Sequence, residues 1–161
     1  MNLIVAVDGN WAIGNNGDLL CKNPIDMKFF KETTTGKVVI MGRKTLESCP
    51  KQKPLPNRTN IVLSRNNEID GCIVVNSIDE LLIKVKNYDD DDLFVIGGGQ
   101  IYKELLPYCK KAYVTKMKNI FKADTYFPNL DELDSWEIVD KSEDLKYENI
   151  EFNFFIYENK K

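Results

Sequence analysis

The sequence predicts an α/β fold with a largely parallel sheet and an antiparallel edge near the C-terminus. Up to Met117, apolar runs too short for helices alternate with segments of helical periodicity. The last two apolar segments, residues 136–142 and 150–157, follow one another without an intervening helix. At 161 residues, the chain 1–161 has the length of one ordinary domain.

The elements of the N-terminal half follow from local signals. Residues 3–7 form an apolar run that stops at Asp8, which predicts a buried first strand. Residues 9–23 carry glycines and asparagines without periodicity, so we expect a loop that acts as a lid. Asn23-Pro24 is an N-cap followed by proline at the first helical position, and predicts a helix that ends near Gly36. Strands are then expected at 37–41 and 58–64, with a short helix at 42–48.

The C-terminal half continues the alternation. Strands are expected at 73–75, 93–96 and 112–117, and helices at 78–86 and 100–106. The acidic run 88–92 is interpreted as a solvated linker. Segments 136–142 and 150–157 then form an antiparallel pair at the edge.

The composition narrows the possible functions. A hydrophobic fraction of 43% and a charged fraction of 29% are globular values, and a net charge of −3 argues against a broad nucleic-acid interface. No apolar stretch approaches membrane-spanning length and no basic leader begins the chain. We therefore expect a cytoplasmic protein, by default a monomer, with small-molecule partners and without a membrane or nucleic-acid partner.

Cysteine and histidine usage restricts the chemistry. The four cysteines are far apart, without a Cys-x-x-Cys pair, and are interpreted as reduced thiols rather than zinc ligands. The chain has no histidine, which removes Ser-His-Asp and Cys-His nucleophile arrangements and imidazole metal sites. We expect no metal. Catalysis must rest on carboxylates, a cofactor, or both.

The segment 94–102, Phe-Val-Ile-Gly-Gly-Gly-Gln-Ile-Tyr, indicates a nucleotide site. Three glycines between a strand and a helix permit unusual backbone dihedrals and leave amide N–H groups bare for a phosphate. The spacing is neither that of the dinucleotide fingerprint nor that of a P-loop. On these residues alone, a purely structural turn remains the alternative.

Several motifs follow one another along the chain: Ile13-Gly14, Asn23-Pro-Ile-Asp26, Phe29-Phe30, Val39-Ile-Met-Gly-Arg-Lys-Thr45, Pro54-Leu-Pro-Asn-Arg58, Val95-Ile-Gly-Gly-Gly-Gln-Ile-Tyr102 and Asp124-Thr-Tyr-Phe-Pro128. Together they resemble the dihydrofolate reductase family. The resemblance implies a single domain with an eight-stranded, mostly parallel sheet flanked by four helices. It also implies NADPH-dependent reduction of 7,8-dihydrofolate to tetrahydrofolate.

The resemblance assigns the catalytic role to Asp26. Taken alone, Asp26 is a first-turn acid that the helix dipole favours, beside Phe30 on the same face. The family match implies that it binds the pterin and supports protonation at N5 while hydride reaches C6. Arg58 matches the residue that binds the α-carboxylate of the glutamate tail. The other positions matched to the pterin and benzoyl pocket are Ile4, Val5, Met27, Phe30, Ile96 and Thr115.

A second set of residues is implied for NADPH. Arg43, Lys44 and Thr45 begin a helix and offer charge and free amides to phosphates, and Ser64 and Arg65 could complete a site for the 2′-phosphate. The family match also implies a cis peptide bond between Gly97 and Gly98. The remaining matched cofactor positions are Ala6, Ile13, Gly14, Gly97, Gly98, Gly99, Gln100, Ile101 and Tyr102.

The chain departs from the family in the loop before the acid. Leu20-Cys21 stands where Pro-Trp is usual, Asn23 and Cys49 replace apolar residues, and a thiol is a small, poor donor. We therefore expect antifolate inhibitors to bind with altered affinity. Two alternatives remain: a related nicotinamide reductase that acts on a ribosylated pyrimidine, or a folate- or nucleotide-binding protein that has lost turnover.

Overall fold

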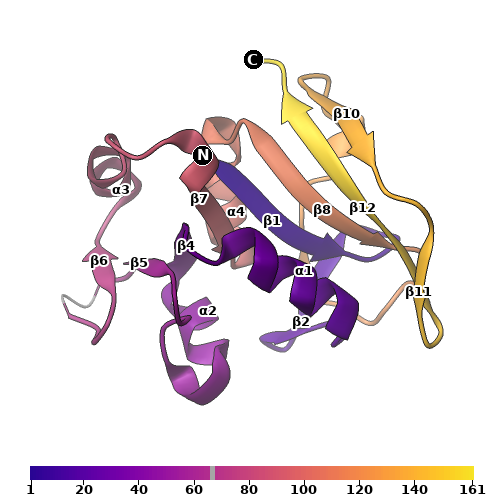
Figure 1. Cartoon of the computed structure of the whole chain (residues 1–161), viewed down its shortest axis with the longest axis horizontal. Coiled ribbons are helices and arrows are strands. Elements are labelled where there is room, and N and C mark those ends of the chain that lie inside the picture. The colour runs from indigo at the N-terminus through magenta and orange to yellow at the C-terminus, as the bar shows by residue number, and fades with distance from the viewer. Residues whose placement is uncertain (66–67) are drawn as a thin grey trace.

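The computed structural model describes residues 1–65 and 68–161 and confirms the α/β fold (Figure 1). The main sheet runs in the order β10-β12-β8-β1-β7-β4-β5-β6, and β11 pairs with β12. Pairing is parallel from β8 to β6 and antiparallel on both sides of β12. The strands of this sheet are β1 (Asn2–Val7), β4 (Val38–Gly42), β5 (Thr59–Leu63), β6 (Ile73–Val75), β7 (Leu93–Gly97), β8 (Lys111–Met117), β10 (Trp136–Lys141), β11 (Leu145–Tyr147) and β12 (Ile150–Asn159).

Four α-helices in the described part of the chain flank the sheet, as the family resemblance implied. Figure 1 shows α1 crossing the front of the sheet and α4 behind it. They are α1 (Pro24–Thr34), α2 (Arg43–Ser48), α3 (Ile78–Lys84) and α4 (Gly99–Leu105), with 3₁₀ turns η1 (Pro50–Gln52), η2 (Asp90–Asp92), η3 (Leu106–Tyr108) and η4 (Leu130–Glu132). None of these helices in the described part of the chain is long and apolar enough to cross a membrane.

Both faces of the sheet are buried at its centre. Along β4, Val38 and Ile40 belong to one apolar cluster, whereas Val39 and Met41 belong to a second cluster with Leu46 of α2. Residues of a strand alternate between the two faces, so this distribution requires cover on both sides. Because both faces of such a strand are buried, nearly every residue along it is apolar, which explains the near-continuous apolar runs in the sequence.

The loop at residues 9–23 is more ordered than the sequence predicted. It contains a small hairpin, β2 (Ala12–Asn15) and β3 (Asp18–Leu19), and β2 pairs with β9 (Thr125–Tyr126). The Asp124 carboxylate accepts a hydrogen bond from the Asn16 N–H at 2.9 Å, and the Asp124 N–H donates to the Gly14 carbonyl at 3.0 Å. Strands this short carry no periodicity, and the partner lies far along the chain. The prediction of an irregular loop was therefore wrong for these residues.

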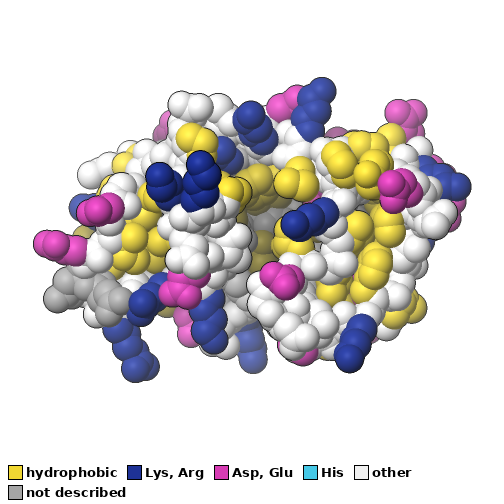
Figure 2. Space-filling model, turned by 90° about the horizontal axis from the view of Figure 1, so that it is seen from below, with side chains coloured by type: hydrophobic (Ala, Val, Ile, Leu, Met, Phe, Trp, Pro, Cys, Tyr) yellow, Lys and Arg dark blue, Asp and Glu magenta, His cyan; other side chains and the backbone are white. Residues whose placement is uncertain are grey.

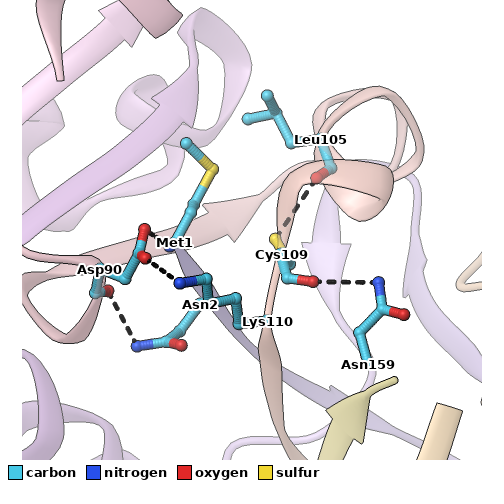
Figure 3. Close-up of polar contacts among 7 residues, drawn as sticks. All are labelled: Met1, Asn2, Asp90, Leu105, Cys109, Lys110 and Asn159. Atoms are coloured by element: carbon cyan, nitrogen blue, oxygen red, sulfur yellow. Dashed lines mark hydrogen bonds and ion pairs between the residues drawn. The ribbon is translucent and has the colours of Figure 1, made fainter. Parts of the chain in front are cut away.

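The acidic linker also differs from its prediction. The Asp90 carboxylate pairs with the amino group of Met1 and with Lys110 Nζ, the latter at 2.6 Å (Figure 3). The Asn2 Nδ2 group donates to the Asp90 carbonyl at 3.2 Å. These contacts join β1 and the start of β8 to η2 at the amino ends of the parallel strands. Asp90 is thus an anchor, and the interpretation of the linker as merely solvated was wrong for it.

Candidate active site

The candidate site lies at the carboxyl ends of the parallel strands. Strand register places Ala6 beside Thr115 and Met41 beside Gly97. In open parallel sheets, ligands bind beyond this edge. Figure 2 views the molecule from below and shows hydrophobic side chains within a hollow near the middle of this face, with Lys and Arg side chains around it.

The glycine turn forms one wall of the site. Strand β7 ends at Gly97, whose φ of +122° suits only glycine, and the Gly97–Gly98 peptide bond is cis, as the resemblance implied. A Cβ on Gly99 would lie 2.7 Å from Thr125 Cγ2. A side chain on Gly99 would displace Thr125, and one on Gly97 would meet Tyr102, so the packing of the chain itself requires glycine at both positions. The turn thus leads from β7 into α4 through backbone without side chains, which suits the phosphate-binding role expected for it.

Several of the other expected cofactor residues surround this turn. Thr45 Oγ1 lies 3.4 Å from the position of a Cβ on Gly98, and Ile13 Cδ1 lies 3.7 Å from that of Gly99. Ile101 packs closely against Gly42, within 3.0 Å of its hypothetical Cβ. Residues of β2 and α2 therefore lie against the glycine turn, although they are far from it in sequence, and Ile101 of α4 joins the turn to the end of β4.

Tyr102 lies beneath the glycine turn. Its side chain is 6% exposed, its ring lies against Gly97, and its hydroxyl donates to the Ile4 carbonyl at 2.7 Å. Burial, with a smaller effect of the Asp26 charge, raises the pKa of this phenol, so it remains a donor. Tyr102 therefore supports the turn and β1 from below, a role that the sequence did not predict.

Asp26 projects from the first turn of α1 toward β8. Its Oδ1 accepts a hydrogen bond from Thr115 Oγ1 at 2.6 Å, whereas Oδ2 has no protein partner within the described residues. Burial raises the pKa of Asp26, and the hydrogen bond from Thr115 opposes that rise. The result is an oriented, desolvated carboxylate with one oxygen free to bind a ligand.

The expected pocket residues differ in exposure. Ile4, Val5 and Thr115 are buried, Phe30 and Ile96 are half-buried, and Met27 is 54% exposed. Phe29, next to Phe30, stacks on Phe154 of β12 with ring centroids 4.3 Å apart. This contact holds α1 against the sheet and so sets the position of Asp26.

Arg58 is held at the other end of α1. Its Nε donates to the Pro56 carbonyl at 2.9 Å, and its Nη1 donates to Thr34 Oγ1 at 3.1 Å. Burial lowers the pKa of Arg58, yet a guanidinium remains charged at neutral pH. A cavity of about 330 Å³ adjoins it, lined by Gly36, Lys37, Asn57, Arg58 and Thr59. The site can accept a carboxylate.

The basic residues expected at the 2′-phosphate lie on neighbouring strand ends. Register pairs Gly42 with Leu63, so Arg43 and Ser64 both follow strands at the same edge. The Arg43 guanidinium, however, pairs with Glu47 at 3.0 Å. A cavity of about 320 Å³ beside it is lined by Arg43, Leu46, Glu47, Gln52, Glu68 and Ile69. Two of its lining residues are acidic, which weakens the attraction of Arg43 for a phosphate; Lys44 and Arg65 are exposed.

The loop before α1 contributes two groups close to Asp26. Cys21 is half-buried; burial, then the charges of Asp26 and Glu148, raise the pKa of its thiol, which therefore stays protonated. Asn23 is 4% exposed and caps α1, with Oδ1 accepting from the N–H groups of Ile25 and Asp26. The cap was predicted from sequence. The burial of its amide was not, although a polar residue at an apolar position was a visible signal.

A bare glycine turn and a desolvated carboxylate thus lie at the carboxyl edge of one sheet, with a guanidinium at the far end of α1. This arrangement fits a class, the α/β proteins that bind a nucleotide beyond the carboxyl ends of parallel strands.

Comparison with known proteins gives the family. A family model described as dihydrofolate reductase matches residues 1–159. The dihydrofolate reductase of Bacillus subtilis (strain 168) is 39% identical over 164 residues, covering 99% of this chain and 95% of the relative. That of Haemophilus influenzae is 42% identical over 138 residues, covering 85% and 83%.

A solved structure agrees. Dihydrofolate reductase from Enterococcus faecalis, complexed with NADP(H) and RAB-propyl, matches with a TM-score of 0.88 and 34% identity, covering 99% of this chain and 96% of the other. The chain belongs to the dihydrofolate reductase family, and its reaction is the NADPH-dependent reduction of dihydrofolate.

Proposed function

We propose that Asp26 is the catalytic residue and that it supports protonation at N5 of 7,8-dihydrofolate. The hydrogen bond from Thr115 and the free Oδ2 carry this proposal. An ionised carboxylate accepts two parallel hydrogen bonds, which suits the amino group and ring N–H of a pterin. Burial raises the pKa of Asp26 toward the range useful for proton transfer.

The positions of Asp26 and Arg58 suit an elongated substrate. Asp26 lies in the first turn of α1, and Arg58 donates to Thr34 in the last. Eight residues of helix separate the two positions by about 12 Å. The substrate would lay its ring at Asp26 and its glutamate α-carboxylate at Arg58. Between them, the remaining pocket residues would contact the pterin and benzoyl groups: Ile4, Val5, Met27, Phe30, Ile96 and Thr115.

NADPH would occupy the other side of the cleft and supply the hydride that reaches pterin C6. The glycines of residues 97–99, with Gln100 and Ile101, would bind its pyrophosphate through backbone amides. Ala6, Ile13, Gly14 and Thr45 would lie near the nicotinamide. Lys44 would contact the cofactor phosphates, and Arg43, Ser64 and Arg65 would enclose the 2′-phosphate. Comparable rates with NADPH and NADH would contradict this last assignment.

The experiment that tests the proposal follows the loss of NADPH absorbance with dihydrofolate. We expect turnover in the parent protein and a loss of about 100-fold or more in kcat for Asp26→Asn, the range of general acid–base catalysis. Asp90→Asn, which removes a carboxylate at the opposite edge of the sheet, is the control and should retain full activity.

Two results would contradict the proposal. Full turnover by Asp26→Asn would remove Asp26 from the chemistry. A folded parent that binds NADPH and folate without turnover would instead be a binding protein, and attention would move to Leu20 and Cys21.

A further inference from the structure

Lys116 occupies a position of β8 that faces the apolar core. Ala112 and Val114 are fully buried and belong to the large apolar cluster of the sheet. Alternate residues of a strand point to one face, so Lys116 takes the next position on that same face, whereas Thr115, which binds Asp26, points to the other. A lysine in such a place needs partners for its charge, and its side chain is 25% exposed.

Two polar side chains fix the ammonium group of Lys116. Its Nζ donates to Asp131 Oδ2 at 2.9 Å and to the Tyr157 hydroxyl at 3.3 Å. That hydroxyl in turn donates to Asp131 Oδ1 at 2.7 Å. Burial, together with the hydrogen bond to Asp131, raises the pKa of the Tyr157 phenol, so it remains a donor at neutral pH. Each of the three groups therefore holds the other two.

Three aromatic rings lie close to the same ammonium group. Its Nζ is 5.1 Å from the ring centroid of Trp11, 4.9 Å from that of Phe155 and 6.0 Å from that of Tyr157. A cation at this distance is attracted by the π electrons of a ring, and more strongly where it is partly removed from water. Phe155 and Tyr157 belong to β12, whereas Trp11 comes from the segment between β1 and β2. Lys116 therefore joins that segment to the edge of the main sheet.

Trp11 immediately precedes β2 and has an unusual backbone conformation. Its φ is +63°, a region that bulky residues seldom adopt. Its carbonyl accepts from the Phe127 N–H at 2.7 Å, and its ring stacks on that of Phe127 with centroids 6.2 Å apart. A conformation of this kind persists only where the surroundings enforce it. The contacts of the Trp11 ring thus maintain the turn that leads into β2.

Strand β2 carries this placement to the glycine turn. Two residues after Trp11, Ile13 Cδ1 lies 3.7 Å from the position of a Cβ on Gly99. The next residue, Gly14, pairs with Thr125, whose Cγ2 lies 2.7 Å from the same position. A change in the position of the Trp11 ring would therefore reach the glycine turn through a segment of three residues.

We propose that Lys116 is a positioning residue: its ammonium group, fixed by Asp131, holds the Trp11 ring and so sets where β2 lies against the glycine turn. An effect on NADPH rests on the proposed function, in which Ile13 and Gly14 lie near the nicotinamide. The placement of β2 does not depend on that function.

The test follows amide hydrogen exchange by NMR in the full chain without ligands. The amides that report on β2 are those of Phe127 and Asp124, which donate to the carbonyls of Trp11 and Gly14. The amides of β4 and β7 report on the main sheet. Affinity for NADPH, measured by equilibrium titration, gives the functional readout.

Three variants separate the charge of Lys116 from its other contributions. Lys116→Met keeps an apolar stem and removes the charge. Asp131→Asn, at a side chain that is 43% exposed, keeps the lysine but removes the carboxylate that fixes it. Lys141→Met is the matched control, because Lys141 Nζ lies 5.6 Å from the Phe155 ring and has no contact with Trp11 within the described residues.

We expect Lys116→Met to speed exchange at Phe127 and Asp124 by about 3- to 30-fold, the range of a cation–π contact. Asp131→Asn should act in the same direction by a smaller factor, and it decides the matter if Lys116→Met fails to fold. Lys141→Met should leave both amides unchanged. The Kd for NADPH should rise by about threefold or more in Lys116→Met, with little change in the KM for dihydrofolate.

Parent-like exchange at Phe127 and Asp124 in both Lys116→Met and Asp131→Asn would overturn the proposal. An equal acceleration of the amides of β4 and β7 would overturn it as well, because Lys116 would then stabilise the whole fold. Faster exchange at the two amides with unchanged affinity for NADPH would support the placement of β2 and reject the proposed contact of Ile13 and Gly14 with the cofactor. The two failures can therefore be told apart.

Discussion

Asp26 and Asp90 lie at opposite edges of the same sheet, and their surroundings shift the pKa of the two carboxyl groups in opposite directions. At the amino edge, Lys110 and the amino group of Met1 hold the pKa of Asp90 at about 2. At the carboxyl edge, burial raises the pKa of Asp26, and Thr115 is its single side-chain donor among the described residues. One carboxylate stabilises the fold, and the other is kept available for a ligand.

Two buried polar residues at the carboxyl edge repeat this contrast. Asp8 is 1% exposed, yet its oxygens accept from the N–H groups of Asn10, Ala12 and Phe121. Asn23 is equally deep but has an unsatisfied amide. Asp8, which shapes the chain, is thus fully bonded, whereas Asn23, which lies beside Asp26 on α1, is not. Sites built for binding commonly sacrifice stability in this manner.

The largest effect should come from Asp26→Asn, which we expect to lower activity while it raises stability at pH 7. The folded-state pKa of Asp26 is raised, so its ionisation destabilises the fold as pH rises above the ordinary value of 3.8. We therefore expect the variant to lose about 100-fold or more in kcat and to gain stability at pH 7 but not near pH 3. Urea unfolding at both pH values is the measurement. A loss of stability at pH 7 would show that the ionised Asp26 stabilises the fold, as Asp90 does, and would contradict the contrast between the two carboxylates.

The next effect should come from Arg58→Lys. A lysine keeps the charge but loses the planar fork that Pro56 and Thr34 orient. We expect the KM for dihydrofolate to rise about tenfold with kcat nearly unchanged, because the lost contact is equally present in the ground state and the transition state. Steady-state kinetics would show it. A fall in kcat at constant KM would place Arg58 in the chemical step instead.

Asp90→Asn should have a smaller effect, confined to stability. A pKa lowered from 3.8 to about 2 corresponds to about 2.4 kcal/mol without screening. Asp90 is 45% exposed, so we expect about 1 kcal/mol at pH 7. This contribution is present above pH 3.8 and fades as pH falls toward 2. Asp89→Asn, at an exposed neighbour, is the matched control. If both variants lost the same free energy of unfolding, the contacts of Asp90 would not anchor the fold.

The smallest change in stability should follow Cys21→Trp. Cys21 is half-buried in the loop, so the fold should tolerate the indole within about 0.5 kcal/mol. The indole adds a donor and a large surface near Asp26, and we expect the affinity for folate-type inhibitors or the rate of loop closure to change by about threefold or more. Inhibitor titration and stopped-flow binding test this. Unchanged inhibitor binding and unchanged rates would show that residue 21 of this loop affects neither.

The sequence by itself determined the order and type of the main elements. Alternating apolar runs predicted β1, β4, β5, β7 and β8, because strands buried on both faces need continuous apolar residues. Asn23-Pro24 predicted the start of α1 because capping is a local interaction within one turn. The glycine run predicted the turn before α4 for the same reason, since backbone freedom belongs to the residues themselves.

Only the tertiary structure decided which distant groups meet. Pairing of β2 with β9, Asp90 with Lys110, Tyr102 with Ile4, and Thr115 with Asp26 joins residues that no local pattern connects. The pKa of each carboxylate follows from such neighbours and from burial, neither of which a linear sequence displays. The unsatisfied amide of Asn23 is a property of the packed loop for the same physical reason: whether a donor lacks a partner depends on everything that surrounds it.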